Sequence, residues 1–395
     1  MMQQVLIAGG GIGGLAAALA CARAGCTVRL YERTPVFSEV GAGIQIGPNV
    51  TRLLHGWGLE EALRAVAAYP DRLQVRHALH GGELGALRLG AEALRRYGAP
   101  YATIHRADLQ QLLLAAVQGL EGVRLYPGRS VQRHADRGGA VALELDDGLQ
   151  VEGDLLLGAD GIWSGVRAQL LADGPPRVSG HLAYRALVRQ SELPPPLRSQ
   201  QVTLWLGPRL HVVHYPVRGG DWLNVVAIVQ GHVQGGLQDW DHAAHAADLQ
   251  ARLGGVCADL RARIESVPAW RLWVLCDRPP LSSARELARG RVALLGDAAH
   301  PMRPYLAQGA GMAIEDAAEL SRQLAQADRV LDVPTLLQRY ALNRCERVAQ
   351  VQARSVRNGR IFHLDGAAAW ARDAALRFGG ERLLDLPWLY GGGPR

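Results

Sequence analysis

The hydrophobic pattern opens with a short apolar run and an alanine-rich stretch separated by glycines. Residues 5–8 are continuously apolar and predict a buried strand, and residues 15–24 predict a helix. Residues 26–31 predict a second strand of the same kind. A membrane span is excluded here, because five glycines interrupt the apolar positions and Arg23 ends them. The chain therefore starts with a strand–turn–helix–strand unit.

The rest of the chain shows two different patterns of apolar and polar positions. Hairpins, strands and a helix typical of a mixed α/β domain are predicted at 73–89, 107–117, 123–126, 141–151 and 154–158. From 177 to 280 the pattern changes to alternating strands rich in Val, Leu and Trp, which predicts a largely antiparallel sheet. A strand at 292–295 then returns the chain to the first domain. Helices are predicted from Gly311 onward and, rich in arginine, over 339–360.

Composition narrows the class of protein. All 43 residues counted as Lys or Arg are arginine, and the formal net charge is +6. The arginines are scattered among 37 acidic residues without a basic run, which excludes nucleic-acid binding and favours small anionic ligands. Five cysteines without CxxC spacing indicate neither a disulfide framework nor a metal site. The lack of a leader-like segment predicts a cytoplasmic protein.

The glycine turn GGGIGG at residues 9–14 has the spacing of a dinucleotide-binding turn. Gly9 permits the tight turn, Gly11 lets the backbone approach a pyrophosphate, and Gly14 lets the helix pack closely on the strand. Glu32 ends the second strand about twenty residues later, where an acid accepts ribose hydroxyls, and Arg33 beside it joins the predicted cofactor-binding set. A purely structural turn is the alternative.

Two later segments add further glycines and aspartates. In GADGIWSGVR, from Gly158, Asp160 either approaches phosphate or ribose or caps the next short helix, and both interpretations stay open. In LLGDAAHPMRPYLAQGAGMAIEDA, from Leu294, Asp297 ends a strand and is placed to accept a ribityl hydroxyl. Gly309 and Ala310 open a helix whose amides would face a flavin ring. Together, the three segments predict a site for FAD rather than for NAD.

These segments, with EVGAGIQIGPN at 39–49 and IHRADLQQLL at 104–113, resemble the single-component (class A) FAD-dependent aromatic hydroxylases. RVSGHLAYRAL at 177–187 and LWLGPRLHVVHYPVR at 204–218 are most similar to the 3-hydroxybenzoate 6-hydroxylases, with salicylate hydroxylases and 6-hydroxynicotinate 3-monooxygenases as neighbours. The resemblance implies Arg106 near the pyrophosphate and ribityl chain. It also implies cofactor contacts by Glu32, Asp160, Asp297, Gly309 and Ala310.

The resemblance further implies an α/β fold, a Rossmann-like FAD-binding domain of the para-hydroxybenzoate hydroxylase type with an inserted, mostly antiparallel β-sheet substrate domain. The FAD-binding domain is expected in three pieces, 1–72, 100–176 and 281–355. The substrate domain is expected at 73–99 and 177–280, and 356–395 as a C-terminal helix and tail.

The strand predicted at 210–217 presents His211 and Tyr215 on one face and His214 on the other, because side chains alternate. The resemblance assigns His211 to the phenol proton, Tyr215 to the carboxylate end, and Tyr101 to support of the ring and flavin. A histidine suits a base because its ordinary pKa lies near neutrality. A hydrogen-bonded core histidine is the alternative interpretation. His214 is interpreted as a core residue.

Four other positions qualify this assignment. His300 is interpreted as structural, since Pro301 fixes the turn after it. Gln45 either reaches the flavin edge or satisfies loop backbone, and both stay open. Pro304 stands where 3-hydroxybenzoate 6-hydroxylases carry a glutamine, and Tyr305 stands where pyridine hydroxylases carry a histidine. Neither subgroup is matched fully, so the regiochemistry stays open.

The implied function is an NADH-dependent monooxygenase of aromatic catabolism that hydroxylates a small hydroxylated aromatic acid through a flavin hydroperoxide. The favoured reaction is 3-hydroxybenzoate to gentisate, with FAD as cofactor and the acid, dioxygen and NADH as partners. Nucleic acid and membrane are not expected as partners, and a homodimer is left open. The alternatives are a salicylate 1-monooxygenase, a 6-hydroxynicotinate 3-monooxygenase, a flavin dehydrogenase or reductase without oxygen insertion, and a non-enzymatic flavin-binding regulator.

Overall fold

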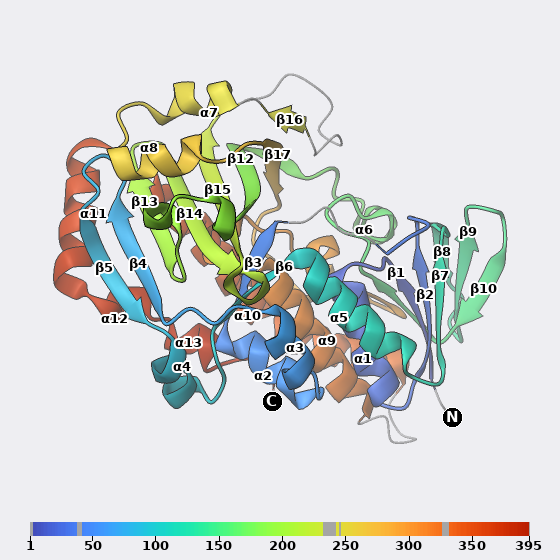
Figure 1. The fold of residues 1–395 in the computed structure, drawn as a ribbon. Coiled ribbons are helices and arrows are strands. Elements are labelled where there is room, and N and C mark those ends of the chain that lie inside the picture. Colours follow the sequence, from blue (N-terminus) through green and yellow to red (C-terminus); the bar gives the residue numbers. More distant parts are fainter. Residues whose placement is uncertain (1–2, 38–41, 232–241, 245, 326–331, 395) are drawn as a thin grey trace.

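The first of two large sheets is mostly parallel and collects strands from distant parts of the chain (Figure 1). The computed structural model describes residues 3–37, 42–231, 242–244, 246–325 and 332–394. Along this six-stranded sheet the order is β18 (Ala288–Arg289), β19 (Val292–Leu294), β11 (Leu155–Gly158), β1 (Gln4–Ala8), β2 (Thr27–Glu32) and β7 (Val123–Pro127). All neighbours pair in parallel except β18 with β19. The central strands β11 and β19 are continuously apolar and buried because both faces of the sheet are covered there.

The register of this sheet brings the three glycine segments together. Ala8 is the register partner of Gly158, and Gly158 is the partner of Leu294. The three strands therefore end at one level, and each continues into one of the three segments. The carboxyl edge of a parallel sheet is where ligands bind in such folds.

Helices α1 (Ile12–Arg23), α5 (Arg106–Gln118), α9 (Gly309–Ala325) and α10 (Val333–Phe362) pack around this sheet (Figure 1). Helix α10 is longer at both ends than the predicted 339–360. It starts earlier because the Asp332 side chain caps it by accepting from the Thr335 N–H at 3.0 Å, and Pro334 stands in its first turn.

The second sheet has eight strands and is antiparallel except for the β13–β4 pair. Its order is β16 (His242–Ala244), β17 (Trp270–Asp277), β12 (Arg177–Arg189), β15 (Trp222–Gln230), β14 (Leu210–Val217), β13 (Val202–Gly207), β4 (Arg72–His77) and β5 (Glu83–Arg88). The hairpin predicted at 73–89 is confirmed as β4 and β5, and it joins this sheet as expected.

Two helices inside the region predicted as strands cover one face of this sheet (Figure 1). These are α7 (Ala246–Leu253) and α8 (Ala258–Glu265), which the pattern of 177–280 did not predict. Leu249, Leu253, Leu260 and Ile264 recur at helical spacing and bury against Val212 and its neighbours. Helices α7 and α8 do not cover the opposite face of the sheet, which carries His211.

The C-terminal segment lies along the outer strand of the second sheet (Figure 1). Helices α11 (Gly366–Gly379) and α12 (Glu381–Leu384) contact β5, and α13 (Pro387–Tyr390) contacts α2. The remaining elements are α2 (Pro48–Gly56), α3 (Glu60–Val66), α4 (Gly90–Tyr97), α6 (Gly165–Leu171), β3 (Gly43–Ile46), β6 (Ala102–His105), β8 (Val131–Asp136), β9 (Val141–Leu145) and β10 (Gln150–Gly153). None of the described helices is both long and apolar enough to cross a membrane. The domain boundaries given above stay a prediction.

Candidate active site

At Gly9 the glycine turn is packed too closely for a side chain. A Cβ atom on Gly9 would lie 2.4 Å from the carbonyl oxygen of Ala159, and Gly9 adopts a φ of +103°. Gly11 caps α1 without a side-chain hydrogen bond, so no capping side chain occupies the first N–H groups of the helix. This arrangement fits the pyrophosphate of a dinucleotide.

Glu32 holds the glycine turn against the end of β2. Its carboxylate accepts from the Gly10 N–H at 2.6 Å and from the Thr34 N–H at 2.9 Å. Arg33, the next residue, is exposed. The proposed ribose contact of Glu32 stays a prediction.

Asp160 braces the start of α6. Its carboxylate accepts from the Val166 N–H at 3.1 Å and from the hydroxyl of Ser164, the helix cap. Burial raises the pKa of Asp160, and these hydrogen bonds oppose the shift. The cap of α6 is thus Ser164, and Asp160 supports it from the preceding turn. A cofactor contact by Asp160 stays a prediction.

The third segment places a carboxylate beside a helix N-terminus. Asp297 is exposed and lies not at the end of β19 but in a 3-10 turn (Gly296–Ala298) just after it. Its Oδ1 is 3.9 Å from where a Cβ on Gly309 would stand, and Gly309 and Ala310 form the first residues of α9. The amides and the carboxylate therefore meet at one corner.

A buried ionic network fixes this corner. Asp316 accepts from the Gly296 N–H at 3.0 Å and pairs with His300 at 2.5 Å and with Arg344 at 2.7 Å. Although burial raises it, His300 and Arg344 lower the pKa of Asp316 to about 2. His300 thus ties the turn to α9, which agrees with the structural interpretation.

His211 lies in a buried cluster of aromatic and histidine side chains, on the face of the second sheet opposite α7 and α8. Its Nδ1 is 2.7 Å from Nε2 of His363, and its ring centroid lies 5.2 Å from that of Tyr305 and 5.4 Å from that of Phe362. Burial, His363 and His181 lower the pKa of His211, so it is neutral near pH 7. His214 points to the opposite face, as predicted, and is also buried.

Tyr215 lies on the same face as His211, also as predicted, but its hydroxyl proton is already used. Tyr215 donates to the Gly43 carbonyl at 2.6 Å and interacts with Gln45. Tyr101 donates to Gln45 at 2.6 Å, so Gln45 links the two tyrosines. This link differs from both open interpretations of Gln45.

Arg185 is the cation of this face, and sequence reasoning missed it. In register, Arg185 faces Val226, which faces Val213, so it stands at a level between His211 and Tyr215. Its guanidinium lies over Trp273 at 4.9 Å and makes no hydrogen bond or ion pair within the described part of the chain. Burial lowers its pKa to about 10, with Tyr215 and Arg106 as the nearest electrostatic influences. It is therefore charged at neutral pH.

Arg106 starts α5 and lies within electrostatic range of Arg185. Its main-chain N–H donates to the Ala42 carbonyl at 3.1 Å. The apolar floor between His211 and Arg185 is formed by Ala183, Val213, Val226, Ile228, Trp273 and Tyr305. A dry floor with a cation at one end and a neutral imidazole at the other is suited to a small aromatic acid.

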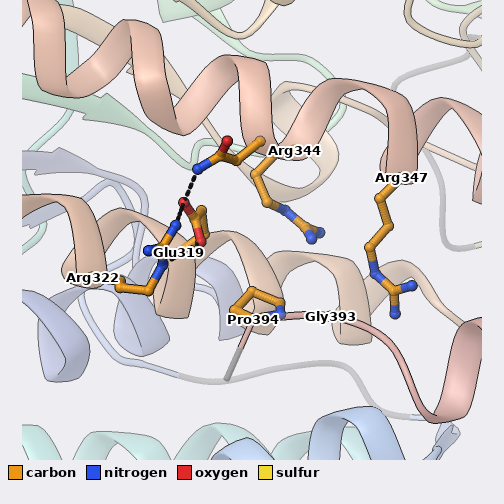
Figure 2. Close-up of a pocket in the computed structure, with 7 residues that line it drawn as sticks. Glu319, Arg322, Arg344, Arg347, Gly393 and Pro394 are labelled. Carbon is orange, nitrogen blue, oxygen red and sulfur yellow. Dashed lines mark hydrogen bonds and ion pairs between the residues drawn. The ribbon is translucent and has the colours of Figure 1, made fainter.

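Figure 2 shows a different hollow, of about 480 Å³, between α9, α10 and the chain end. Its lining combines Arg322, Arg344 and Arg347 with Glu319 and Asn343, and Arg322 pairs with Glu319 at 2.7 Å. Arg344 and Arg347 pair with Glu315. None of the predicted site residues lines it, so it is not the candidate active site. The described residues also lack a cluster of three or more His, Cys, Asp or Glu that could hold a metal ion.

A protein-family model described as an FAD binding domain matches residues 2–355. The chain belongs to this family. The 3-hydroxybenzoate 6-hydroxylase of Polaromonas naphthalenivorans (strain CJ2) is 38% identical over 389 residues, covering 98% of this chain and 95% of that protein. The 3-amino-4-hydroxybenzoate 2-monooxygenase PtnB3 of Streptomyces platensis is 38% identical over 396 residues, covering 98% and 96%. A solved salicylate hydroxylase substrate complex superposes with a TM-score of 0.83 at 27% identity, covering 99% and 96%.

These findings confirm the resemblance and the fold class, and they make the protein an FAD-dependent monooxygenase. The glycine turn fits FAD because a Cβ is excluded at Gly9 and Gly14, and the register of the strand ends brings this turn to the level of the other two glycine segments.

Proposed function

We propose that this flavoprotein is an NADH-dependent monooxygenase that hydroxylates a small hydroxylated aromatic acid, with 3-hydroxybenzoate converted to gentisate as the favoured reaction. One oxygen atom of dioxygen enters the ring, and the other leaves as water with the two electrons of NADH. When bound, FAD supplies the redox chemistry that couples NADH to dioxygen.

The observation that carries this proposal is the pairing of Arg185 with His211 across one apolar face. A half-buried cation that has no hydrogen-bond or ion-pair partner among the described residues is costly, and a carboxylate ligand would relieve that cost. A neutral imidazole at the far end can accept a phenol proton. A ring that carries a carboxylate and a hydroxyl would satisfy both ends.

In this proposal His211 takes the phenol proton, which makes the ring more nucleophilic toward oxygen. Arg185 is the main partner of the carboxylate, because Tyr215 already donates its proton to Gly43. Tyr215 flanks that carboxylate. Tyr101 supports Tyr215 through Gln45, with which both tyrosines interact. Glu32, Arg33, Arg106, Asp160, Asp297, Gly309 and Ala310 are proposed to contact FAD. The buried floor keeps water from the reacting ring.

The deciding experiment supplies purified, FAD-loaded protein with NADH and single aromatic acids. The panel is 3-hydroxybenzoate, 3-amino-4-hydroxybenzoate, salicylate, 4-hydroxybenzoate and 6-hydroxynicotinate, and NADH loss, peroxide and product are recorded together. Coupled gentisate from 3-hydroxybenzoate supports the proposal. Coupled product from another acid would identify that acid as the substrate in place of 3-hydroxybenzoate. If the acid is salicylate or 6-hydroxynicotinate, the protein is a salicylate 1-monooxygenase or a 6-hydroxynicotinate 3-monooxygenase. NADH loss that no acid accelerates would contradict the hydroxylase function and favour a reductase.

A further inference from the structure

His363 joins the candidate active site from a part of the chain 152 residues beyond His211. It stands at the C-terminal cap of α10 and is only 6% exposed. We propose that His363 is the proton-relay partner of His211, receiving a proton through the 2.7 Å contact between the two rings when the substrate phenol ionises. This inference rests on the proposed function, because it requires a phenolic substrate.

The two ring nitrogens of His211 have different roles in this proposal. Nδ1 is engaged with Nε2 of His363, and this is the one side-chain hydrogen bond of His211 among the described residues. The two imidazoles can share one proton between them, since a neutral ring has one donor and one acceptor nitrogen. The proton on the shared contact therefore decides whether Nε2 of His211 accepts from the substrate or donates to it.

Each transfer in the relay balances. The phenol O–H bond breaks and an N–H bond forms at Nε2 of His211, while the N–H bond at Nδ1 of His211 breaks and one forms at Nε2 of His363. His211 stays neutral and becomes a donor to the phenolate, and the positive charge stands on His363. The Nδ1 proton of His363 then leaves to a water molecule, which has to reach this buried nitrogen before the release is complete.

The surroundings of His363 disfavour a lasting positive charge on its ring. Burial, His181, Arg372 and Arg303 lower the pKa of His363 to about 3. Arg303 is paired with Asp277 at 2.6 Å, and Tyr305 faces the ring at a centroid distance of 5.9 Å. Nδ1 of His363 is buried and has no partner among the described residues. Positive charge on this ring is therefore disfavoured.

A purely structural role would require only that His363 orient the ring of His211. Glutamine tests this distinction, since its amide can accept from Nδ1 of His211 but cannot pass a proton onward. Phenylalanine fills the space without the hydrogen bond. His214, on the opposite face of the same strand, provides a matched buried control.

The experiment mixes oxidised, FAD-loaded protein with 3-hydroxybenzoate in weak buffer without NADH. A pH-indicator dye reports proton release, and the ultraviolet absorbance of the acid reports phenolate. We expect His363→Gln to bind the acid within about twofold of the unaltered protein and to release the proton about a hundredfold more slowly. His363→Phe should be at least as slow, and His214→Gln should keep the rapid phase.

The outcomes separate the two proposals. Rapid proton release by His363→Gln, in a protein whose unaltered form gives coupled gentisate, would overturn the relay and leave the proposed function intact. An unaltered protein that hydroxylates the acid but releases no proton on binding it would also overturn the relay alone. A protein that responds to no acid in the panel would remove the proposed function and the relay with it.

Discussion

Gly14 lies directly against the carbonyl group of Gly9. A Cβ atom on Gly14 would stand 1.9 Å from that oxygen, far inside van der Waals contact. The first turn of α1 is therefore pressed onto the turn that precedes it, and the first N–H groups of the helix, which no side chain caps, are held at one fixed position. This contact makes the glycine necessary through backbone rather than through a flexible side chain.

Replacing Gly14 should therefore disrupt FAD binding. Gly14→Ala forces the turn open, and we expect FAD occupancy to fall at least about tenfold, since main-chain donors at a helix N-terminus bind the pyrophosphate. Flavin absorbance per protein and thermal unfolding measure both consequences. Gly56→Ala, at a helical glycine with open space around it, is the matched control and should keep the flavin. Full occupancy in Gly14→Ala would contradict the placement of the cofactor.

Arg185 should govern affinity for the acid more than the rate of its conversion. We expect Arg185→Gln to weaken binding of 3-hydroxybenzoate about 10- to 100-fold, because a charge-assisted hydrogen bond contributes about 1.5–3 kcal/mol. Binding of the neutral 3-hydroxybenzamide should change little. The measurement is titration of the flavin absorbance with each ligand.

The control for this change lies four residues along the same strand. Arg189 lies over Trp222 at 5.0 Å, much as Arg185 lies over Trp273 at 4.9 Å, but Arg189 is exposed. Arg189→Gln should leave affinity for the acid unchanged. Equal losses for acid and amide in Arg185→Gln would mean that the guanidinium acts only by packing.

His211 should matter to hydroxylation and not to the cofactor. His211→Ala removes the proton acceptor, so we expect coupled product formation to slow about a hundredfold or more, while FAD affinity stays unchanged. Product and peroxide are measured together, because uncoupled turnover would still consume NADH. Coupled turnover equal to that of the unaltered protein would remove His211 from the role of base.

Much of this site could be predicted because its signals are local. The glycine spacing and the apolar strands predicted three strand ends that each lead into a glycine segment. The register of Ala8, Gly158 and Leu294 brings these strand ends to one level. Alternation along β14 is sufficient to place His211 and Tyr215 on one face. Period-two and glycine patterns express backbone geometry, which the local sequence controls.

Other parts depended on tertiary contacts that the local sequence does not carry. His363 reaches His211 only because α10 ends beside β14, and no local pattern marks that meeting. Arg185 could be assigned a parity on its strand, but its face follows from pairing with β15. Helices α7 and α8 were missed although Leu249, Leu253, Leu260 and Ile264 follow helical spacing, since the neighbouring strands dominated the interpretation.

The buried histidines should make the protein sensitive to mild acid. Burial is the first cause that lowers the pKa of His181 to about 4, and those of His214 and His363 to about 3. Between these values and the ordinary pKa of about 6.5, the unfolded chain binds protons that the folded chain does not. Stability is therefore expected to be full above about pH 6.5 and to fall as pH decreases, by about 1.4 kcal/mol per pH unit for each histidine.

Urea unfolding at about pH 7.5 and about pH 5 tests this expectation in a window where Asp316 does not interfere. With a pKa of about 2, that carboxyl loses its stabilising contribution only at lower pH. His214→Leu removes one titrating group and two buried nitrogens that lack partners among the described residues. We expect it to lessen the acid loss by about 1.4 kcal/mol per pH unit. An identical loss in His214→Leu and the unaltered protein would show that His214 is already protonated or exposed in the folded state.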